Sequence, residues 1–260
     1  MPLDHTPLEL NDFDKEVVNY IEKLTGHIRH AAINALEHLV KAQKIVEIDP
    51  EMAAFRAFTA EEEAATALFL TLKKLGYKNS ERIRHRDHRF KAGLHPFITA
   101  VYHQIYELSL FSAIKLVWEK TPSGEHERRL QLALKEKDSG LYIVPEPPLN
   151  FQVSTLDGPT YFEKKIDELC KGVGKEKALE HIEEIANIRN RLLYAGDSGC
   201  WRLNEERLSQ DIEGCKSRTL LILRILCLIH PYKDQSPFVQ QCLDGYLIMM
   251  GKITKEEMIT

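Results

Sequence analysis

Apolar residues recur at helical spacing along the first part of the chain. This spacing predicts a helical segment over about residues 11–48, with a break near Gly26. Asp49 then offers a capping side chain, and Pro50 suits the first position of a helix. A second helix is therefore expected from Pro50 to about residue 75, ended by Gly76 in a left-handed conformation.

A third helical region is predicted over about residues 79–120, with Pro96 as a kink or break. The pattern then changes, because leucines at positions 130, 132 and 134 alternate with other residues. Asp138-Ser139-Gly140 has turn chemistry, and the alternation resumes over residues 141–144. Together they predict a β-hairpin, followed by a short strand near Phe151 and Val153.

Helical spacing resumes near Pro159 and continues to the end of the sequence, with breaks at residues 172–174, residues 196–199 and Pro231. The expected architecture is mostly α: one helical bundle domain over residues 1–260, with a small β-hairpin insertion at about residues 129–155.

Composition narrows the class of protein. The 260 residues are 43% hydrophobic and 28% charged, which excludes disordered, collagen-like and disulfide-scaffold proteins. A net charge of −4 argues against a protein that coats DNA. No apolar run is long enough to span a membrane, and no signal peptide is recognisable, so we expect no membrane association. Five cysteines without a CxxC pair predict free thiols and a cytoplasmic location.

A carboxylate interrupts one apolar helix face. Positions 55, 58, 62, 65, 69 and 72 share a face and are aromatic or aliphatic apart from Glu62. Alanines form the roughly opposite stripe, so the helix is expected to be covered on both sides. A carboxylate removed from water needs a cation or several hydrogen-bond donors, and Glu62 is therefore a candidate binding residue.

The helix predicted over residues 175–195 has a lone positive charge in its apolar face, where the earlier helix has a lone negative charge. Arg189 is the one charge in its apolar seam, beside a polar stripe that includes Asn190 and Tyr194. We hypothesise that Glu62 and Arg189 pair across two packed helices. Such a pair either forms part of a functional pocket or serves only to specify packing.

A basic, histidine-rich run occupies residues 80–95. If it is helical, Arg84, His88, Lys91 and His95 lie on one face, which suits an anion such as phosphate. His88 is also suited to proton transfer near neutral pH. The alternative is a solvated basic face without a ligand.

Motifs for metals and cofactors are missing. The sequence contains neither HExxH nor Glu-x-x-His, and the arginines of residues 80–95 would repel a cation. Gly172-Val-Gly174-Lys175 lacks the spacing of a phosphate-binding loop. We therefore expect no metal and no cofactor.

The segment Ile188-Arg-Asn-Arg-Leu-Leu-Tyr-Ala-Gly196 resembles the signature helix of HEPN domains, where an Arg is often followed by Asn. Residues 60–65 and 86–91 also look like the abortive-infection V branch of that superfamily. The resemblance implies an all-α, commonly dimeric protein, with a role in phage defence or in a toxin-type system. The family's catalytic His is replaced here by Tyr194 or is missing.

Two functions follow as hypotheses. In the first, the chain binds RNA or a nucleotide through phosphate: Arg189 holds the charge, Asn190 orients it, and Glu62 fixes Arg189. RNA cleavage without metal then requires His88 as the proton carrier near Arg189, since tyrosine is a poor base at neutral pH. In the second, the chain is a non-catalytic interaction module with an unidentified protein partner, and the charged residues are core contacts.

Overall fold

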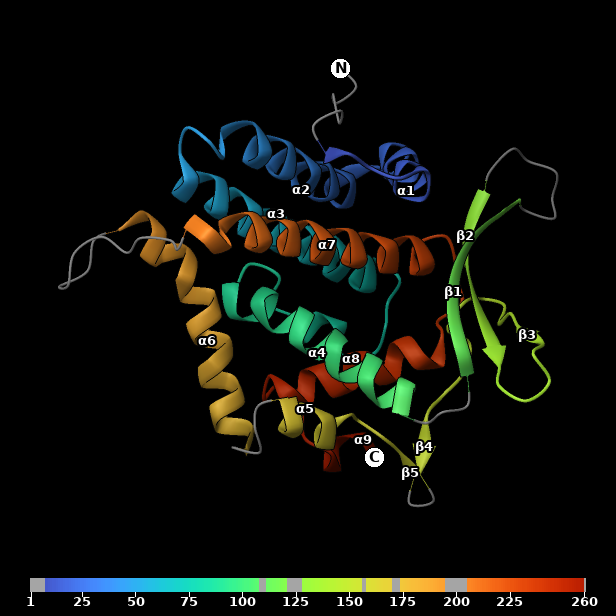
Figure 1. Cartoon of the computed structure of the whole chain (residues 1–260). Coiled ribbons are helices and arrows are strands. Elements are labelled where there is room, and N and C mark those ends of the chain that lie inside the picture. The colour runs from blue at the N-terminus through green and yellow to red at the C-terminus, as the bar shows by residue number, and fades with distance from the viewer. Residues whose placement is uncertain are drawn as a thin grey trace. The chain divides into compact units, whose positions relative to one another are not determined.

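The computed structural model describes residues 8–107, 111–120, 128–155, 158–169, 174–194 and 205–259. It confirms the expected class, a mostly α-helical chain with a small antiparallel β insertion (Figure 1). The elements are α1 (Asp12–Glu22), α2 (Gly26–Ile45), α3 (Pro50–Lys74), a short 3-10 helix (Ser80–Arg82), α4 (His88–Glu107), β1 (Phe111–Lys120), β2 (Arg128–Glu136), β3 (Tyr142–Ile143), β4 (Ser154–Thr155), β5 (Gly158–Pro159), α5 (Glu163–Leu169), α6 (Gly174–Leu193), α7 (Glu205–Ile229), α8 (Pro237–Met249) and α9 (Glu256–Ile259).

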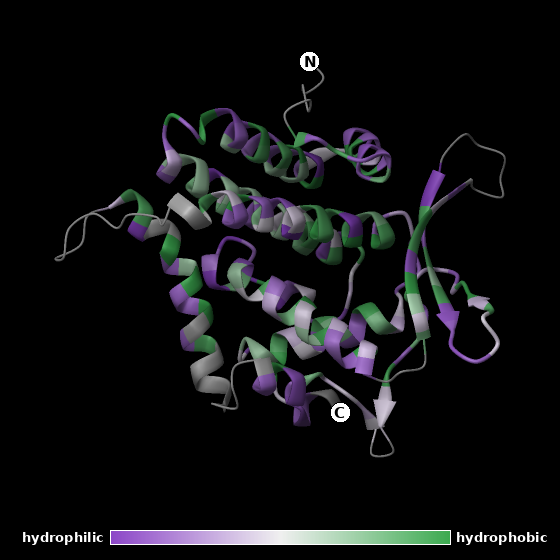
Figure 2. Ribbon diagram, viewed as in Figure 1, coloured by the Kyte–Doolittle hydropathy of each residue, from purple (hydrophilic) through white to green (hydrophobic). Residues whose placement is uncertain are grey.

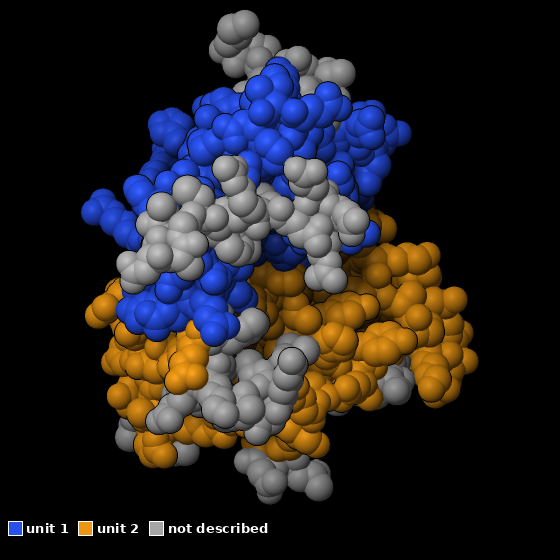
Figure 3. Space-filling model, turned by 60° about the vertical axis from the view of Figure 1, so that its left-hand side comes forward, with its two compact units in different colours: residues 1–71, 85–92, 182–226 blue, residues 72–84, 93–181, 227–260 orange. Residues whose placement is uncertain are grey.

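The chain divides into two compact units, which Figure 3 colours separately. Unit 1 comprises residues 1–71, 85–92 and 182–226, and unit 2 comprises residues 72–84, 93–181 and 227–260. Each unit is thus assembled from separate stretches of sequence. The single-domain organisation expected from the sequence stays a prediction.

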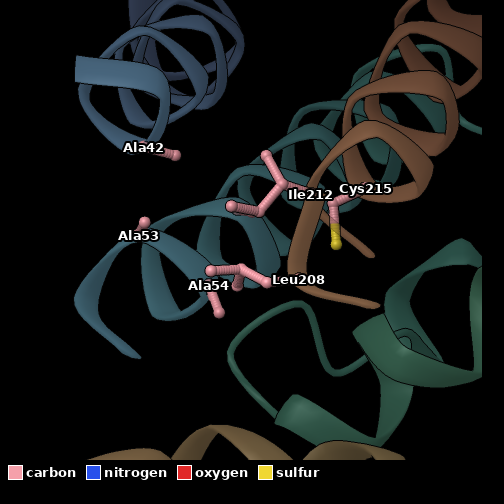
Figure 4. Packing of buried hydrophobic residues seen from close by; sticks show 7 residues of the cluster. Ala42, Ala53, Ala54, Leu208, Ile212 and Cys215 are labelled. Carbon is pink, nitrogen blue, oxygen red and sulfur yellow. The ribbon is translucent and has the colours of Figure 1, made fainter. Parts of the chain in front are cut away.

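Small residues let three helices of unit 1 pack closely. Ala42 of α2, Ala53 and Ala54 of α3, and Ile212 and Cys215 of α7 belong to one buried cluster (Figure 4). Alanine side chains are short, so two helix backbones can approach one another with few lost contacts. Figure 2 shows hydrophilic and hydrophobic residues alternating around α2, as expected of a helix that buries one side.

The two ends of α3 follow the signals in the sequence. The Asp49 carboxylate accepts a hydrogen bond from the backbone N–H of Met52 at 3.0 Å, which caps the helix before Pro50. At the other end Gly76 has φ +70°, and the N–H of Tyr77 donates to the carbonyl of Leu72 at 3.2 Å. A left-handed glycine with this backbone bond is the Schellman ending, which confirms both predicted boundaries.

The β insertion belongs to unit 2. The predicted hairpin is confirmed, because β2 and β3 pair antiparallel around Gly140, which has φ +70°. A further strand, β1, pairs along the other edge of β2, with Trp118 opposite Leu130 and Ile114 opposite Leu134. The prediction of helix up to residue 120 is therefore wrong for residues 111–120. The predicted strand near Phe151 is also displaced, since the pairing lies at β4 and β5.

Aromatic side chains form much of the core of unit 2. Phe97 meets Phe162 and Tyr246 edge to face, with ring centroids 5.9 and 5.4 Å apart. Phe151 stacks on Phe238 of α8 at 4.5 Å. The Gln241 amide donates to the carbonyls of Val153 and Thr160, so α8 holds the loop that carries β4 and β5.

At Gly245 the backbone of α8 packs directly against Tyr161, Phe162 and Phe97. A Cβ placed there would lie 2.9 Å from the carbonyl oxygen of Tyr161 and 3.3 Å from ring atoms of Phe162 and Phe97. We expect Gly245→Ala to lower the free energy of unfolding by about 1–3 kcal/mol, because backbone and rings must move apart. Urea unfolding measures this, with Ser209→Ala on α7 as the control. Equal stability of Gly245→Ala and the unmodified chain would contradict the packing described.

Candidate functional site

The start of α4 sets the position of the candidate site in unit 1. The Asp87 carboxylate accepts a hydrogen bond from the backbone N–H of Arg89 at 3.0 Å, and the Asp87 carbonyl accepts from the N–H of Lys91 at 3.3 Å. Asp87 therefore caps a helix whose first residue is His88. The cap places His88 and Lys91 on neighbouring turns of the same helix face.

Glu62 of α3 joins these two side chains. The His88 Nδ1 lies 2.9 Å from each oxygen of the Glu62 carboxylate, and the Lys91 Nζ lies 3.3 Å from Oε2. The side chains of Glu62 and Lys91 are 12% and 8% exposed, whereas that of His88 is 47% exposed. The arrangement is a nearly buried ion pair with an imidazole at its solvent side.

The carboxylate also selects one form of the imidazole. An ionised carboxylate has no hydrogen to donate, so the Nδ1–H of His88 donates to Glu62. In the neutral ring the other nitrogen, Nε2, then carries the lone pair that accepts a proton. A carboxylate that orients a histidine in this way is the arrangement used in general-base catalysis.

Because Glu62 and Lys91 are both nearly buried, each charge depends on the other for stabilisation. An ammonium group that is almost removed from water loses much of its hydration, and the carboxylate compensates for part of that loss. Each group also limits the rotamers of the other. The pair consequently fixes the carboxylate that orients His88.

Two further cations lie next to the site in sequence. Arg86 is exposed, and Arg89 is also exposed, with one guanidinium nitrogen 3.6 Å from the Asp87 carboxylate. Guanidinium groups in water bind phosphate oxygens through paired hydrogen bonds. Exposed positive charge close to His88 in the sequence is therefore available to an anionic ligand.

The other predicted site residues are placed differently. Arg84 lies before α4, so the prediction that it shares a helix face with His88 is wrong: the backbone of residues 83–87 is not helical. Arg84 and His95 both belong to unit 2. Arg189 and Asn190 lie in α6, but their side chains fall outside the described residues, so the Glu62–Arg189 pair stays a prediction. Tyr194 follows the end of α6 and is 69% exposed.

Sequence reasoning missed two charged pairs in unit 1. The Arg218 Nε donates to the Glu61 carboxylate at 2.8 Å, and burial raises the pKa of Glu61 more than the guanidinium lowers it. Arg224 donates three hydrogen bonds of 2.7–2.9 Å to Asp14. The signal for the second pair was available, because Arg224 interrupts the most apolar run of the chain.

Burial makes the described cysteine thiols weak nucleophiles. The described cysteines at positions 215, 227 and 242 are free, and burial raises the pKa of the Cys215 thiol to about 12. A thiol with such a pKa is almost entirely protonated at neutral pH and a weak nucleophile. Within the described ranges, no group of three His, Cys, Asp or Glu side chains could hold a metal ion.

None of the described helices is both long and apolar enough to cross a membrane.

Comparisons do not assign the chain to a known group. No protein-family model, no curated protein and no solved structure matches the chain.

Proposed function

We propose that this chain is a HEPN-like RNA-binding protein that cleaves RNA without a metal ion, with His88 as its proton carrier. The observation that carries the proposal is the pair of 2.9 Å contacts between the His88 Nδ1 and the Glu62 carboxylate. This contact leaves Nε2 as the proton acceptor of a half-exposed imidazole.

The proposed reaction is an intramolecular transesterification of RNA. The Nε2 of His88 takes the proton of a ribose 2′-hydroxyl, and the resulting oxygen attacks the adjacent phosphorus. The bond from phosphorus to the 5′-oxygen breaks, and water protonates the departing oxygen. The imidazolium then returns its proton to solvent, leaving a 2′,3′-cyclic phosphate and a 5′-hydroxyl.

Positive charge has a separate role in the proposal. Negative charge on the phosphate oxygens increases as the 2′-oxygen attacks, and fixed cations stabilise that charge. Arg86 and Arg89 are exposed beside His88 and supply it from the described residues. Arg189 and Asn190 would add a guanidinium and an amide, as the HEPN resemblance implies.

The resemblance extends the proposal to the biological setting. HEPN proteins commonly act as homodimers, and we propose the same for this chain, in the cytoplasm and within a phage-defence or toxin-type system. Size-exclusion chromatography with light scattering tests the dimer directly. A monomer at micromolar concentration would contradict that part of the proposal.

Incubation of the purified chain with a mixed RNA pool in EDTA tests the activity. We expect fragments that end in 2′,3′-cyclic phosphate, and binding of a fluorescent RNA whose affinity falls as salt rises, because phosphate contacts release counterions. Arg86→Ala with Arg89→Ala is expected to weaken binding. Intact RNA would overturn the proposed cleavage, and the absence of measurable RNA binding would overturn the proposed RNA binding as well.

One observation favours the second candidate, a protein-interaction module. The four consecutive apolar residues from Leu141 to Val144 are 44–69% exposed around β3, which lies at one edge of its sheet. Exposed apolar edges of this kind are sites of protein association. If Tyr142→Ser with Ile143→Ser changes the light-scattering mass but not RNA binding, the hairpin carries a protein contact separate from the RNA site.

A further inference from the structure

A pocket of about 380 Å³ opens in unit 1 beside the start of α2. Its wall contains hydrogen-bond donors from α2 and a carboxylate from α3. The residues that matter to its chemistry are His27, Arg29, His30, Asn34 and Glu63. The volume lies in the range that holds a small organic ligand.

Glu63 distinguishes this pocket from the site at His88. Three successive glutamates of α3 point in different directions, since residues on a helix are rotated by about 100° from one to the next. Glu61 holds Arg218 and Glu62 holds His88, whereas Glu63 lines the pocket and makes no hydrogen bond or ion pair with another described residue. A half-buried carboxylate without a partner among the described residues is suited to hydrogen-bond donors of a ligand.

One donor of the same pocket, Arg29, is already held in place. The Arg29 Nε donates to the carbonyl oxygen of Glu22 at 3.0 Å, which anchors the guanidinium. Its terminal nitrogens make no hydrogen bond with another described residue and are suited to bind a ligand. Glu37, the other carboxylate of the wall, is held by Lys41 at 2.9 Å. The pocket thus combines one available carboxylate with one anchored guanidinium.

This combination matches one base among the four of RNA. Guanine alone has two adjacent donors on its pairing edge, N1–H and the N2 amino group, which suit the two oxygens of a carboxylate. Its O6 and N7 acceptors suit arginine. The exposed imidazoles of His27 and His30 provide flat surfaces against which an unpaired base stacks. We infer that the pocket is a guanine-binding subsite that selects the RNA segment presented to His88.

The pocket lies close to the proposed reaction site within unit 1. The His27 ring meets the His85 ring edge to face, with centroids 6.4 Å apart, and His85 belongs to the turn that leads into α4. Glu63 and Glu62 are also adjacent in sequence. A nucleotide bound in the pocket would thus lie near the phosphates of the same strand at His88. The inference rests on the proposed function for its substrate, RNA.

Calorimetric titration of the full chain with GMP, IMP and AMP tests the inference. We expect GMP to bind at least about tenfold more tightly than AMP, because each bidentate contact to a base carries a discrimination of that order. IMP lacks the N2 amino group, so its affinity is expected to lie between the two. Equal affinity for GMP and AMP would overturn the inference.

Glu63→Gln provides the decisive variant. The amide replaces one acceptor oxygen of the carboxylate with an NH2 donor, which would face one of the two donors of guanine. The affinity for GMP is therefore expected to fall to that for AMP, while Glu47→Gln at an exposed position near the end of α2 leaves it unchanged. Unchanged GMP affinity in Glu63→Gln would overturn the inference. If the chain cleaves RNA through His88 without preference for guanine, the guanine subsite is contradicted and the proposed function is not. If the chain binds GMP selectively but leaves RNA intact, the proposed function is contradicted and the subsite is supported.

Discussion

His88→Ala is expected to lower the rate of RNA cleavage about 10²–10⁴-fold, the usual contribution of a positioned general base. The reason is the geometry of the imidazole, whose Nδ1–H donates to Glu62 at 2.9 Å and whose Nε2 is therefore the proton acceptor. Alanine removes the acceptor without burying a new charge. Single-turnover assays with labelled RNA measure the chemical step separately from binding.

A second histidine of α4 provides the matched control. His103 is exposed and belongs to unit 2, so His103→Ala is expected to cleave RNA at the rate of the unmodified chain. Thermal unfolding of both variants shows whether the fold is retained. Cleavage by a folded His88→Ala at the unmodified rate would eliminate His88 as the proton carrier.

Arg224→Ala is expected to lower the free energy of unfolding by about 3–5 kcal/mol, because it leaves a buried carboxylate without its cation. The Asp14 side chain is only 4% exposed, and Arg224 gives it three hydrogen bonds. The guanidinium also lies 5.4 Å from the centre of the Phe13 ring, so the substitution removes a cation–π contact as well. Urea unfolding at pH 7 measures the loss.

An exposed ion pair of α1 is the comparison. Lys15 and Asp12 lie 2.8 Å apart, but their side chains are 61% and 98% exposed. Lys15→Ala is expected to cost less than about 1 kcal/mol, since water screens such pairs. If Arg224→Ala were no more costly than Lys15→Ala, the Asp14 pair would contribute little to stability.

Helix boundaries were predictable where a single nearby residue determines the backbone conformation at the helix end. Gly26 has φ +64° at the start of α2, and Asp49 caps α3, as the sequence indicates. These signals act within a few residues of the position they control. They therefore need no information about the rest of the fold.

Strand β1 was not predictable by the same reasoning. Residues 111–120 contain Leu116, Trp118 and Glu119 and have no proline or glycine to end the helix that precedes them. Their extended conformation is stabilised by pairing with β2, which is a contact between separate parts of the chain. Helix propensity is a weak preference that such pairing overrides.

The sequence indicated which kinds of side chain form the candidate site, but not which of them meet. Glu62 among aromatic neighbours indicated a carboxylate in need of a cation, and the structure brings it to His88 and Lys91. The sequence could not show which basic residues would meet it, because the 83–87 segment departs from the helix that the spacing suggested. That departure separates Arg84 from the face of α4 that carries His88.

The interleaving of the two units has a consequence for synthesis on the ribosome. Unit 1 needs its last stretch, which ends at Leu226, and unit 2 needs residues up to Thr260. Neither unit can be completed until its last stretch has been translated, so neither can finish folding while the first half of the chain emerges. The α3 segment would meanwhile expose its alanine and aromatic residues to water, so the nascent chain would carry an unburied apolar stretch until the later stretches arrive.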